Sequence, residues 1–300
     1  MPEAKTLYRS RISPYVQKLA QNLGGEIASR LMRQFTPSPE EEVATPGFIR
    51  DPLHEEDPDI QPIPGILHKY PNKILYLTTD ECPVFCRYCT RKRITLAAHK
   101  QEPSLEKVVD YLQKHREVQE VIFSGGDPFM LKDEKLWQIS STLASLSHIQ
   151  FFRYHTRIVT TLPSRFTPSL WELLENLTKL QLRSITLVSH INLAQEITGE
   201  AKEIFRRLKQ LGFRLLNQAV LLAGVNDRAE ILRELMLALD EAGVTPYYLH
   251  QLDPVEGSSH FLVPVEKGLR LFDELRRTLP TYLLPRYVQD SKQGKINLAY

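Results

Sequence analysis

Short runs of apolar and β-branched residues alternate along the chain with longer amphipathic stretches. Six such runs predict buried strands, and they cover 74–79, 121–124, 149–155, 184–190, 213–222 and 245–250. Between most of them, apolar residues recur at helical spacing, as in 104–115, 133–146, 199–212 and 226–243. Strand and helix in alternation indicate βαβ units and therefore a parallel sheet in an α/β fold. Six units predict either an incomplete α/β barrel or a doubly wound sheet.

The two ends of the chain have other patterns. Apolar positions three and four residues apart predict helices at 13–25 and 26–35, and prolines exclude long regular elements from 36–65. Beyond the last strand, one helix is predicted at 265–279, followed by an irregular polar tail. We therefore expect three segments: a helical and Pro-rich N-terminal segment at 1–73, the sheet and its helices at 74–262, and a C-terminal helix and tail at 263–300.

Composition and charge exclude several classes of partner. The chain has 38 Lys+Arg against 36 Asp+Glu, so no overall field attracts nucleic acid or an acidic membrane. No apolar run approaches the roughly 18 residues that span a bilayer. The first fifteen residues, MPEAKTLYRSRISPY, lack the apolar centre of a signal peptide. We therefore expect a cytoplasmic protein that binds neither nucleic acid nor membranes.

All 3 cysteines of the chain stand in one short stretch, ECPVFCRYC, directly after the first predicted strand. Cysteines in the cytosol stay reduced, so clustered Cys82, Cys86 and Cys89 indicate metal or redox chemistry rather than disulfides. A structural zinc ion would need a fourth ligand, which one of the 9 histidines could supply. A [4Fe-4S] cluster normally takes four thiolates, so three would leave one iron open for another ligand. Both metals fit the residues at this point.

The C-x3-C-x2-C spacing resembles that of the radical S-adenosylmethionine (SAM) enzymes. The resemblance implies a [4Fe-4S] cluster whose open iron binds S-adenosylmethionine, which is then cleaved to a 5′-deoxyadenosyl radical. The stretch FSGGDP resembles the GGD element of these enzymes, so Gly125, Gly126 and Asp127 are expected to support the amino group of S-adenosylmethionine. The implied fold is a partial (β/α)6 barrel of the radical SAM type, with a helical N-terminal extension and a C-terminal cofactor-binding tail.

From about residue 46 to the end, the chain resembles the lysine 2,3-aminomutase family, including its short members associated with elongation factor P. The matching stretches include PGILHKYPNK, CRYCTRKR, HINLAQEIT, LLNQAVLLAGVND, PYYLHQLDPVEGSSHF and YVQDSKQGK. The resemblance implies an isomerase that converts L-lysine to β-lysine through a 5′-deoxyadenosyl radical and an imine of pyridoxal 5′-phosphate. The alternatives are an elongation factor P-associated lysine aminomutase and a 2,3-aminomutase for another amino acid such as glutamate or arginine.

The same resemblance implies which residues hold pyridoxal phosphate. Lys295, in YVQDSKQGKINL, is expected to bind the cofactor covalently, and Lys292 is the competing candidate three residues away. Lys69 and Lys73, in HKYPNK, match basic positions that bind the phosphate, which lysine can do as a point charge. Gln218, in LLNQAV, matches a polar residue near the cofactor at the end of a strand.

Three further residues indicate the substrate. Arg91 matches the arginine that binds the substrate carboxylate. Asp253, in HQLDPVEG, and Asp290, in YVQDSKQGK, match the two acidic residues that bind the ε-ammonium group in lysine-specific members. Two carboxylates favour a buried ammonium group far more than one does. The pair therefore favours a basic amino acid as substrate.

The expected partners are free lysine, an electron donor such as flavodoxin or ferredoxin, and a second copy of the chain in a homodimer. Two other functions compete with this hypothesis. One is a radical enzyme that uses no pyridoxal phosphate, and the other is a zinc-stabilised binding or scaffold protein.

Overall fold

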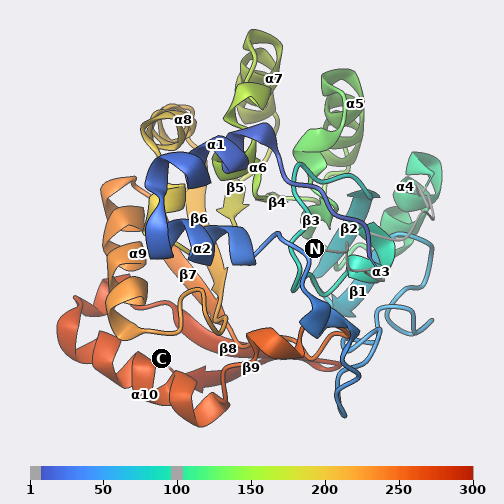
Figure 1. The fold of residues 1–300 in the computed structure, drawn as a ribbon. Coiled ribbons are helices and arrows are strands. Elements are labelled where there is room, and N and C mark those ends of the chain that lie inside the picture. The colour runs from blue at the N-terminus through green and yellow to red at the C-terminus, as the bar shows by residue number, and fades with distance from the viewer. Residues whose placement is uncertain (1–7, 96–103, 300) are drawn as a thin grey trace.

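A parallel sheet that curls round on itself forms the centre of the molecule (Figure 1). The computed structural model describes residues 8–95 and 104–299. Within them, nine strands lie side by side in their order along the chain. Strands β2 to β8 run parallel, and β1 and β9 pair antiparallel at the two edges. The strands are β1 (Ile66–Tyr70), β2 (Lys73–Thr79), β3 (Glu120–Gly125), β4 (Phe151–Thr156), β5 (Ser184–Ser189), β6 (Arg214–Val220), β7 (Thr245–His250), β8 (Arg286–Ser291) and β9 (Gly294–Ala299).

The strand order decides between the two predicted topologies. A doubly wound sheet reverses its strand order at one point, whereas here every crossover leads to the next strand in the same direction. Successive crossovers of one hand curl the sheet into a barrel with the helices outside, as Figure 1 shows. The prediction of a partial α/β barrel is confirmed, and the six predicted strands correspond to β2 to β7.

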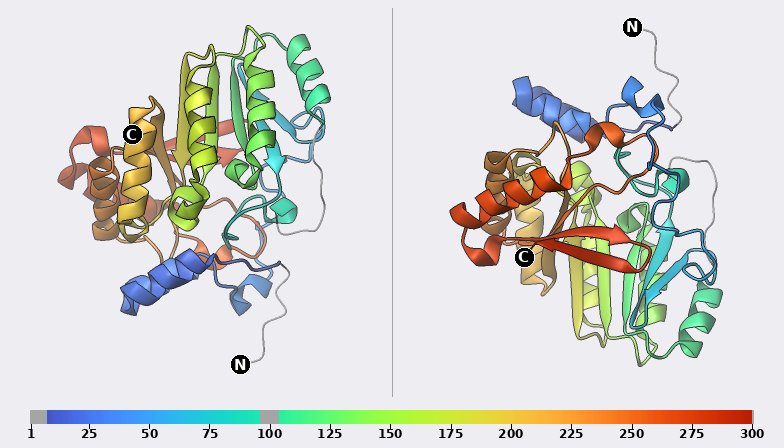
Figure 2. Two further views of the ribbon diagram at one scale, coloured as in Figure 1. Left: turned by 90° about the horizontal axis from the view of Figure 1, so that it is seen from above. Right: turned by 90° about the horizontal axis from the view of Figure 1, so that it is seen from below.

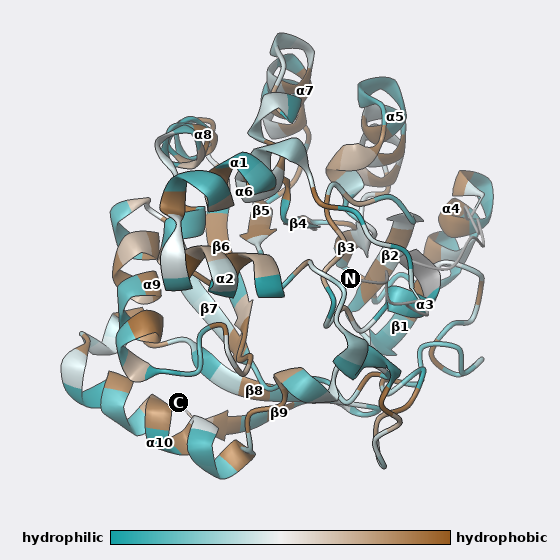
Figure 3. Cartoon of the chain, in the orientation of Figure 1, coloured by the Kyte–Doolittle hydropathy of each residue, from teal (hydrophilic) through white to brown (hydrophobic). Residues whose placement is uncertain are grey.

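The longer helices that follow the strands cover the outer face of the sheet because each has one apolar side. In α10, for example, the buried residues Gly268, Leu271, Phe272 and Leu275 recur at helical spacing. Figure 3 shows hydrophobic and hydrophilic residues mixed along this helix. The helices are α1 (Pro14–Leu23), α2 (Gly25–Arg33), α3 (Lys92–Thr95), α4 (Leu105–Lys114), α5 (Asp133–Ala144), α6 (Ile158–Thr161), α7 (Pro168–Thr178), α8 (Gly199–Gln210), α9 (Ala229–Glu241) and α10 (Val265–Thr278).

Three strands were not predicted from the sequence. Strand β1 directly follows the Pro-rich stretch, in the segment 1–73 where no strand was expected, and β8 and β9 fall in the tail interpreted as irregular. That interpretation of the tail is wrong. The tail is rich in polar residues because one side of β8 and β9 faces the interior of the barrel, where the polar side chains of Asp290 and Lys295 meet. The division into three segments stays a prediction.

The hairpin of β8 and β9 closes the gap between the last and the first strands of the barrel. Lys69 of β1 donates from Nζ to the Ser291 carbonyl at 2.9 Å, and the Lys295 N–H donates to the Tyr70 hydroxyl at 2.9 Å. Gly294 has a φ of +123°, and a Cβ there would lie 2.6 Å from that hydroxyl oxygen. Glycine is therefore needed both for the turn and for the approach of the tyrosine.

The N-terminal helices α1 and α2 lie across one end of the barrel (Figure 2). The prediction of these two helices is confirmed. Residues 1–7, part of the stretch interpreted as lacking a signal peptide, lie outside the described residues. In the part of the chain that is described, no helix combines the length and apolar character needed to cross a bilayer.

Candidate active site

The cysteine loop follows β2 and lies at the end of the barrel where the N-terminal helices pack. Its three cysteines are half-buried and form no disulfide: Cys82, Cys86 and Cys89. Two backbone hydrogen bonds of 2.9 Å tie the loop to the N-terminal segment, from Phe85 N–H to the Arg11 carbonyl and from Arg87 N–H to the Gln34 carbonyl. The N-terminal segment therefore positions the loop that carries the thiols, a role that the sequence pattern did not reveal.

A buried ion pair strengthens this attachment. Arg87 lies between Cys86 and Tyr88 in the loop, and its guanidinium binds both carboxylate oxygens of Glu41, at 2.8 and 2.6 Å. The side chains are 0% and 2% exposed. A bidentate pair of this kind fixes orientation as well as charge.

The two glycines after β3 allow the chain to approach the cysteine loop closely. Gly125 has a φ of +108°, and a Cβ there would lie 2.5 Å from the Thr79 carbonyl oxygen. A Cβ on Gly126 would lie 2.2 Å from the Glu81 carbonyl oxygen. No side chain fits at either position, so the GG pair is required for the packing of β3 against the start of the loop.

Asp127 joins the ends of β3 and β4. Its carboxylate accepts hydrogen bonds from the Thr156 hydroxyl at 2.8 Å, from Arg157 N–H at 2.7 Å and from Phe129 N–H at 3.1 Å. Burial raises the pKa of Asp127 to about 6, although these hydrogen bonds oppose the shift. The carboxylate is thus engaged within the protein, and its predicted contact with S-adenosylmethionine stays a prediction.

Burial acts on two of the three thiols. Burial raises the pKa of Cys82 well above its usual value, and the negative charge of Asp127 adds to the shift. Burial also raises the pKa of Cys89. Within the described residues, no three His, Cys, Asp or Glu side chains converge on a single metal ion. The thiolates of a cubane cluster differ in this respect because each binds a different iron.

Lys295 and Asp290 meet inside the barrel. The Lys295 ammonium donates to both carboxylate oxygens of Asp290 at 2.7 Å and lies 5.2 Å from the centre of the Tyr248 ring. His250 Nδ1 lies 3.2 Å from Asp290 Oδ2. Burial would raise the pKa of Asp290, but His250 and Lys295 outweigh burial and lower it well below its usual value. Asp290 is therefore charged, and the sequence analysis missed both His250 and Tyr248.

Asp253 lies near Asp290 and Lys295, but its carboxylate has fewer hydrogen-bond partners than that of Asp290. The Thr90 hydroxyl donates to Asp253 Oδ2 at 2.6 Å, whereas Oδ1 is buried and has no hydrogen-bond partner among the described residues. Burial, followed by the negative charge of Asp290, raises the pKa of Asp253 to about 6. The structure thus brings the two predicted ammonium-binding carboxylates together. The charge of Asp290 is paired with Lys295 and His250, whereas Asp253 has no cationic partner that forms an ion pair with it among the described residues.

The burial of the Asp253 carboxylate leads to a prediction about the stability of the fold. The pKa of Asp253 rises from 3.8 to about 6 on folding, so its unfavourable effect on stability appears as the pH rises through that interval. We expect Asp253→Asn to be more stable than the native sequence at pH 8, by about 3 kcal/mol, with the difference vanishing near pH 4. Urea unfolding of the metal-free chain at both pH values measures it.

Asp290→Asn is the matched control, because the pKa of Asp290 is shifted the other way. It should destabilise the chain at pH 8 through the loss of the pairing with Lys295 and His250. A destabilised Asp253→Asn variant at pH 8 would contradict the account of the Asp253 environment.

Arg91 and Lys69 bring positive charge to the same region. Arg91 donates from Nε and Nη2 to the two carboxylate oxygens of Glu55, at 3.0 and 2.7 Å. Burial lowers the pKa of Lys69, although Glu55 and Asp290 oppose the shift. Glu55 is a third residue that the sequence analysis missed, because it lies in the Pro-rich stretch interpreted as a connector. Its side chain is only 3% exposed, which no local sequence pattern indicated.

The remaining predicted residues differ in their positions. Lys292 donates to Asp57 Oδ2 at 2.8 Å with its side chain 48% exposed, so the structure separates it from Lys295. Lys73 stands at the start of β2 with its ammonium 4.3 Å from the centre of the Tyr70 ring. Gln218 is half-buried on β6, opposite Tyr248 of β7. The structure therefore places Gln218 on the strand next to the Lys295 group, whereas Lys73 lies at the opposite end of β2 from the cysteine loop.

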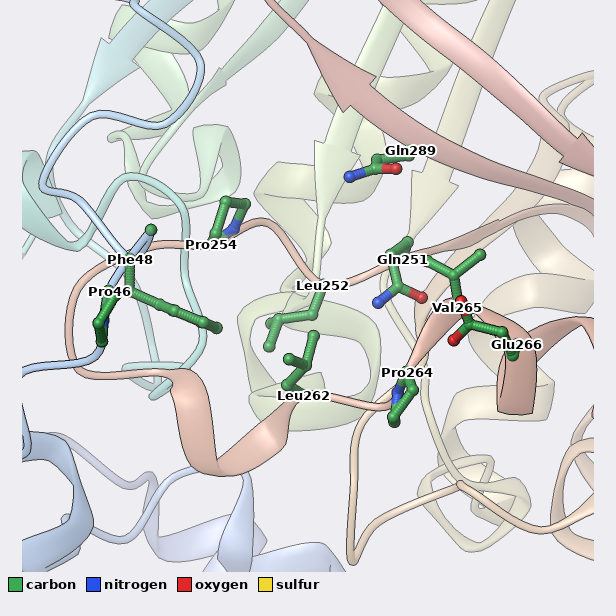
Figure 4. Close-up of a pocket in the computed structure, with 11 residues that line it drawn as sticks. Pro46, Phe48, Gln251, Leu252, Pro254, Leu262, Pro264, Val265, Glu266 and Gln289 are labelled. Carbon is green, nitrogen blue, oxygen red and sulfur yellow. The ribbon is translucent and has the colours of Figure 1, made fainter.

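A distinct cavity of about 330 Å3 lies between the N-terminal connector and the chain that follows β7. Figure 4 shows its mainly apolar lining, with Gln251, Glu266 and Gln289 as polar groups. None of the predicted site residues lines it. Gln289 and Asp290 alternate along β8, so the cavity and the barrel interior lie on opposite faces of that strand.

Three comparisons with known proteins agree with this geometry. Residues 76–236 match the family model described as the Radical SAM superfamily. A radical SAM methyltransferase from Sphaerobacter thermophilus superposes with a TM-score of 0.50 at 20% identity, covering 74% of this chain and 68% of the other, which supports the fold alone. The barrel, the cysteine loop after its first parallel strand and the match together define a radical SAM protein.

Comparison with individual proteins is more specific. An L-lysine 2,3-aminomutase of Escherichia coli K12 is 38% identical over 289 residues, which cover 96% of this chain and 82% of that protein. One of Buchnera aphidicola is 39% identical over 269 residues, with 89% and 77% covered. One of Bacillus subtilis 168 is 34% identical over 285 residues, but the match covers 59% of its length. The chain belongs to the lysine 2,3-aminomutase family.

Membership of this family brings three cofactors: a [4Fe-4S] cluster, S-adenosylmethionine and pyridoxal 5′-phosphate. The residues present fit these groups. Buried polar atoms without partners among the described residues occur near Lys295, namely His155 Nε2, His250 Nε2 and Asp253 Oδ1, and beside Cys86, namely Arg157 Nε. Buried polar groups are normally hydrogen-bonded, so these atoms indicate that polar ligands belong in both places. Three thiols on one loop suit iron.

Proposed function

We propose that this chain is an L-lysine 2,3-aminomutase that moves the amino group of L-lysine from Cα to Cβ and so forms β-lysine. The observation that carries the proposal is the meeting of Asp253 and Asp290 inside the barrel, in the neighbourhood of Lys295 and Arg91. A pair of carboxylates and a guanidinium in one region suit the ε-ammonium and the carboxylate of lysine.

In this proposal, the residues of the chain bind and orient the three cofactors. Cys82, Cys86 and Cys89 hold the cluster, and Gly125 and Gly126 keep the backbone close to it. Lys295 would bind pyridoxal phosphate covalently, with Lys69, Lys73 and Gln218 around the cofactor. Asp127 would support the amino group of S-adenosylmethionine. When bound, the cofactors supply the radical and the electron sink that the migration needs.

Substrate recognition follows from the charges. Arg91 is held by Glu55 and would exchange this partner for the substrate carboxylate, which it can bind in the same bidentate manner. Asp290 is charged and is paired with Lys295. Once Lys295 is engaged by the cofactor, Asp290 and Asp253 are left to accept the ε-ammonium. The unpartnered Oδ1 of Asp253 is an acceptor ready for such a donor.

The wider setting is also part of the proposal. A cluster of this kind needs a one-electron donor, and a flavodoxin or a ferredoxin has suitable chemistry. A homodimer is the commonest symmetric assembly for a chain of this type. A cytoplasmic location suits reduced thiols.

An anaerobic assay tests the function. The chain is reconstituted with iron, sulfide and pyridoxal phosphate and is supplied with S-adenosylmethionine and dithionite as the reductant. The formation of β-amino acid is then followed from L-lysine, L-arginine and L-glutamate in parallel. We expect turnover of lysine and about four iron and four sulfide per chain. Turnover of glutamate but not of lysine would overturn the argument from the acidic pair. One zinc and no sulfide would instead support a scaffold protein.

A further inference from the structure

Arg157 links one cysteine of the loop to a network of buried polar groups. The residue follows β4, and its Nη1 donates to Cys86 Sγ at 3.0 Å and to the Tyr88 hydroxyl at 2.7 Å. Its Nη2 donates to Gln34 Oε1 at 2.6 Å and to Glu196 Oε2 at 2.8 Å. A buried positive charge is thus hydrogen-bonded to the sulfur that would ligate iron.

The network holds this guanidinium in one orientation. Asn192 Nδ2 donates to the Tyr88 hydroxyl at 2.7 Å and to Gln34 Oε1 at 2.9 Å, so two of the four acceptors of Arg157 are themselves fixed. The Arg157 guanidinium also lies 4.5 Å from the centre of the Phe35 ring. Gln34 and Phe35 follow α2, so the N-terminal segment takes part in holding the arginine that contacts Cys86.

Glu196 is the negative partner and is equally fixed. Its Oε1 accepts hydrogen bonds from the backbone N–H groups of Asn192 and Leu193, both at 3.0 Å, while Oε2 faces Arg157. The side chains of Arg157 and Glu196 are 6% and 2% exposed. Solvent screens the charges little at this burial, so both act on the cluster site.

Two opposite effects follow for an iron–sulfur cluster bound through Cys86. Hydrogen bonds to the sulfur ligands and the nearby net charge both set the reduction potential. Reduction makes the cluster more negative by one electron, so Arg157 favours the reduced state and Glu196 opposes it. We propose that Arg157 and Glu196 form a charge pair that sets the reduction potential of the cluster through Cys86, with Arg157 as a positioning residue.

The redox step in this proposal is simple. The cluster accepts one electron from a low-potential one-electron donor, which is oxidised by one electron, and no bond forms or breaks. The proposal requires that the cluster binds, as the family membership states, but it does not require that lysine is the substrate. Its test therefore uses no amino acid, and its failure is distinguishable from failure of the proposed function.

The experiment is an anaerobic potentiometric titration of the reconstituted chain with dithionite, in which electron paramagnetic resonance measures the reduced cluster. Arg157→Gln removes the positive charge, and Glu196→Gln removes the negative charge while an amide oxygen can still accept the two backbone hydrogen bonds. At a fixed potential, we expect the ratio of reduced to oxidised cluster to fall about tenfold in Arg157→Gln and to rise about tenfold in Glu196→Gln. A tenfold change corresponds to about 59 mV for one electron. Arg157→Lys keeps the positive charge but loses the several hydrogen bonds that the guanidinium donates. Its ratio of reduced to oxidised cluster should lie between those of the native chain and Arg157→Gln.

Arg153→Gln is the matched control. Arg153 forms its own ion pair, with Glu120 at 2.8 Å, at the start of β3 and so at the opposite end of that strand from the GG pair and the cysteine loop. It should leave the potential unchanged. Shifts of the same sign in Arg157→Gln and Glu196→Gln, or no shift in either with iron retained, would overturn the proposal. Loss of iron in both variants would also overturn it, because the pair would then be structural.

Discussion

Replacing Lys295 with alanine should abolish turnover of lysine and the visible absorbance of bound pyridoxal phosphate, whereas replacing Lys292 should leave both in place. The two lysines are three residues apart on one hairpin, but the pleat and the turn send them to different surroundings. Lys295 pairs with Asp290 inside the barrel, and Lys292 pairs with Asp57 on the outside. We expect Lys295→Ala to lower the rate by at least about a thousandfold, because a covalent anchor is lost.

The measurement adds pyridoxal phosphate to the reconstituted chains and records the absorbance and the rate of β-lysine formation. Both variants should contain the same iron and sulfide as the native sequence, since neither lysine contacts the cysteine loop in the described structure. Retained absorbance in Lys295→Ala together with its loss in Lys292→Ala would reverse the assignment of the anchor.

Replacing Glu41 with alanine should destabilise the chain by about 3 to 5 kcal/mol. The reason is that Arg87 keeps its buried positive charge while losing both of its hydrogen bonds to carboxylate oxygens. Arg87 is part of the cysteine loop, so we also expect the variant to bind less iron during reconstitution. Urea unfolding of the metal-free chain measures the first effect, and iron analysis measures the second.

Two further variants separate the cause from a general loss of a salt bridge. Glu203→Ala removes an exposed pair with Arg206, three residues away on α8, and should change the stability by less than about 1 kcal/mol. The double variant Glu41→Leu with Arg87→Met removes both buried charges and should recover most of the lost stability. Equal destabilisation by Glu41→Ala and Glu203→Ala would contradict the role of burial.

The interior of the barrel shows why local sequence patterns give only part of a site. Along β4, Phe152 and Tyr154 are buried against the helices, while Arg153 and His155 alternate with them and point the other way. The alternation was visible in the sequence as a strand. The nearness of His155 to His250 of β7 and Lys295 of β9 was not visible, because strand order in space has no local signature.

Family resemblance and local sequence pattern identify different residues of the site. The motif stretches led to Asp253, Asp290, Arg91 and Lys295, and the structure brings these residues into one region although it does not test their roles. His250 lies within one of the same stretches, PYYLHQLD, two residues from Tyr248 on the same face of β7. The period of two was therefore a usable signal for His250, and it was not used. Glu55 had no such signal.

Residue order along the chain was enough to establish the six parallel strands, most of their helices and the loop with three thiols, because periodicity and clustering are local properties. Periodicity left a doubly wound sheet open, and the tertiary structure decided against it. Only the tertiary structure showed that the tail closes the sheet as a hairpin, with Lys295 paired to Asp290 and Lys292 paired to Asp57. It alone brought Gln34, Glu41 and Arg157 to the cysteine loop. These contacts join residues tens to hundreds of positions apart, and they form only when burial of the shared core offsets the entropy of bringing distant segments together.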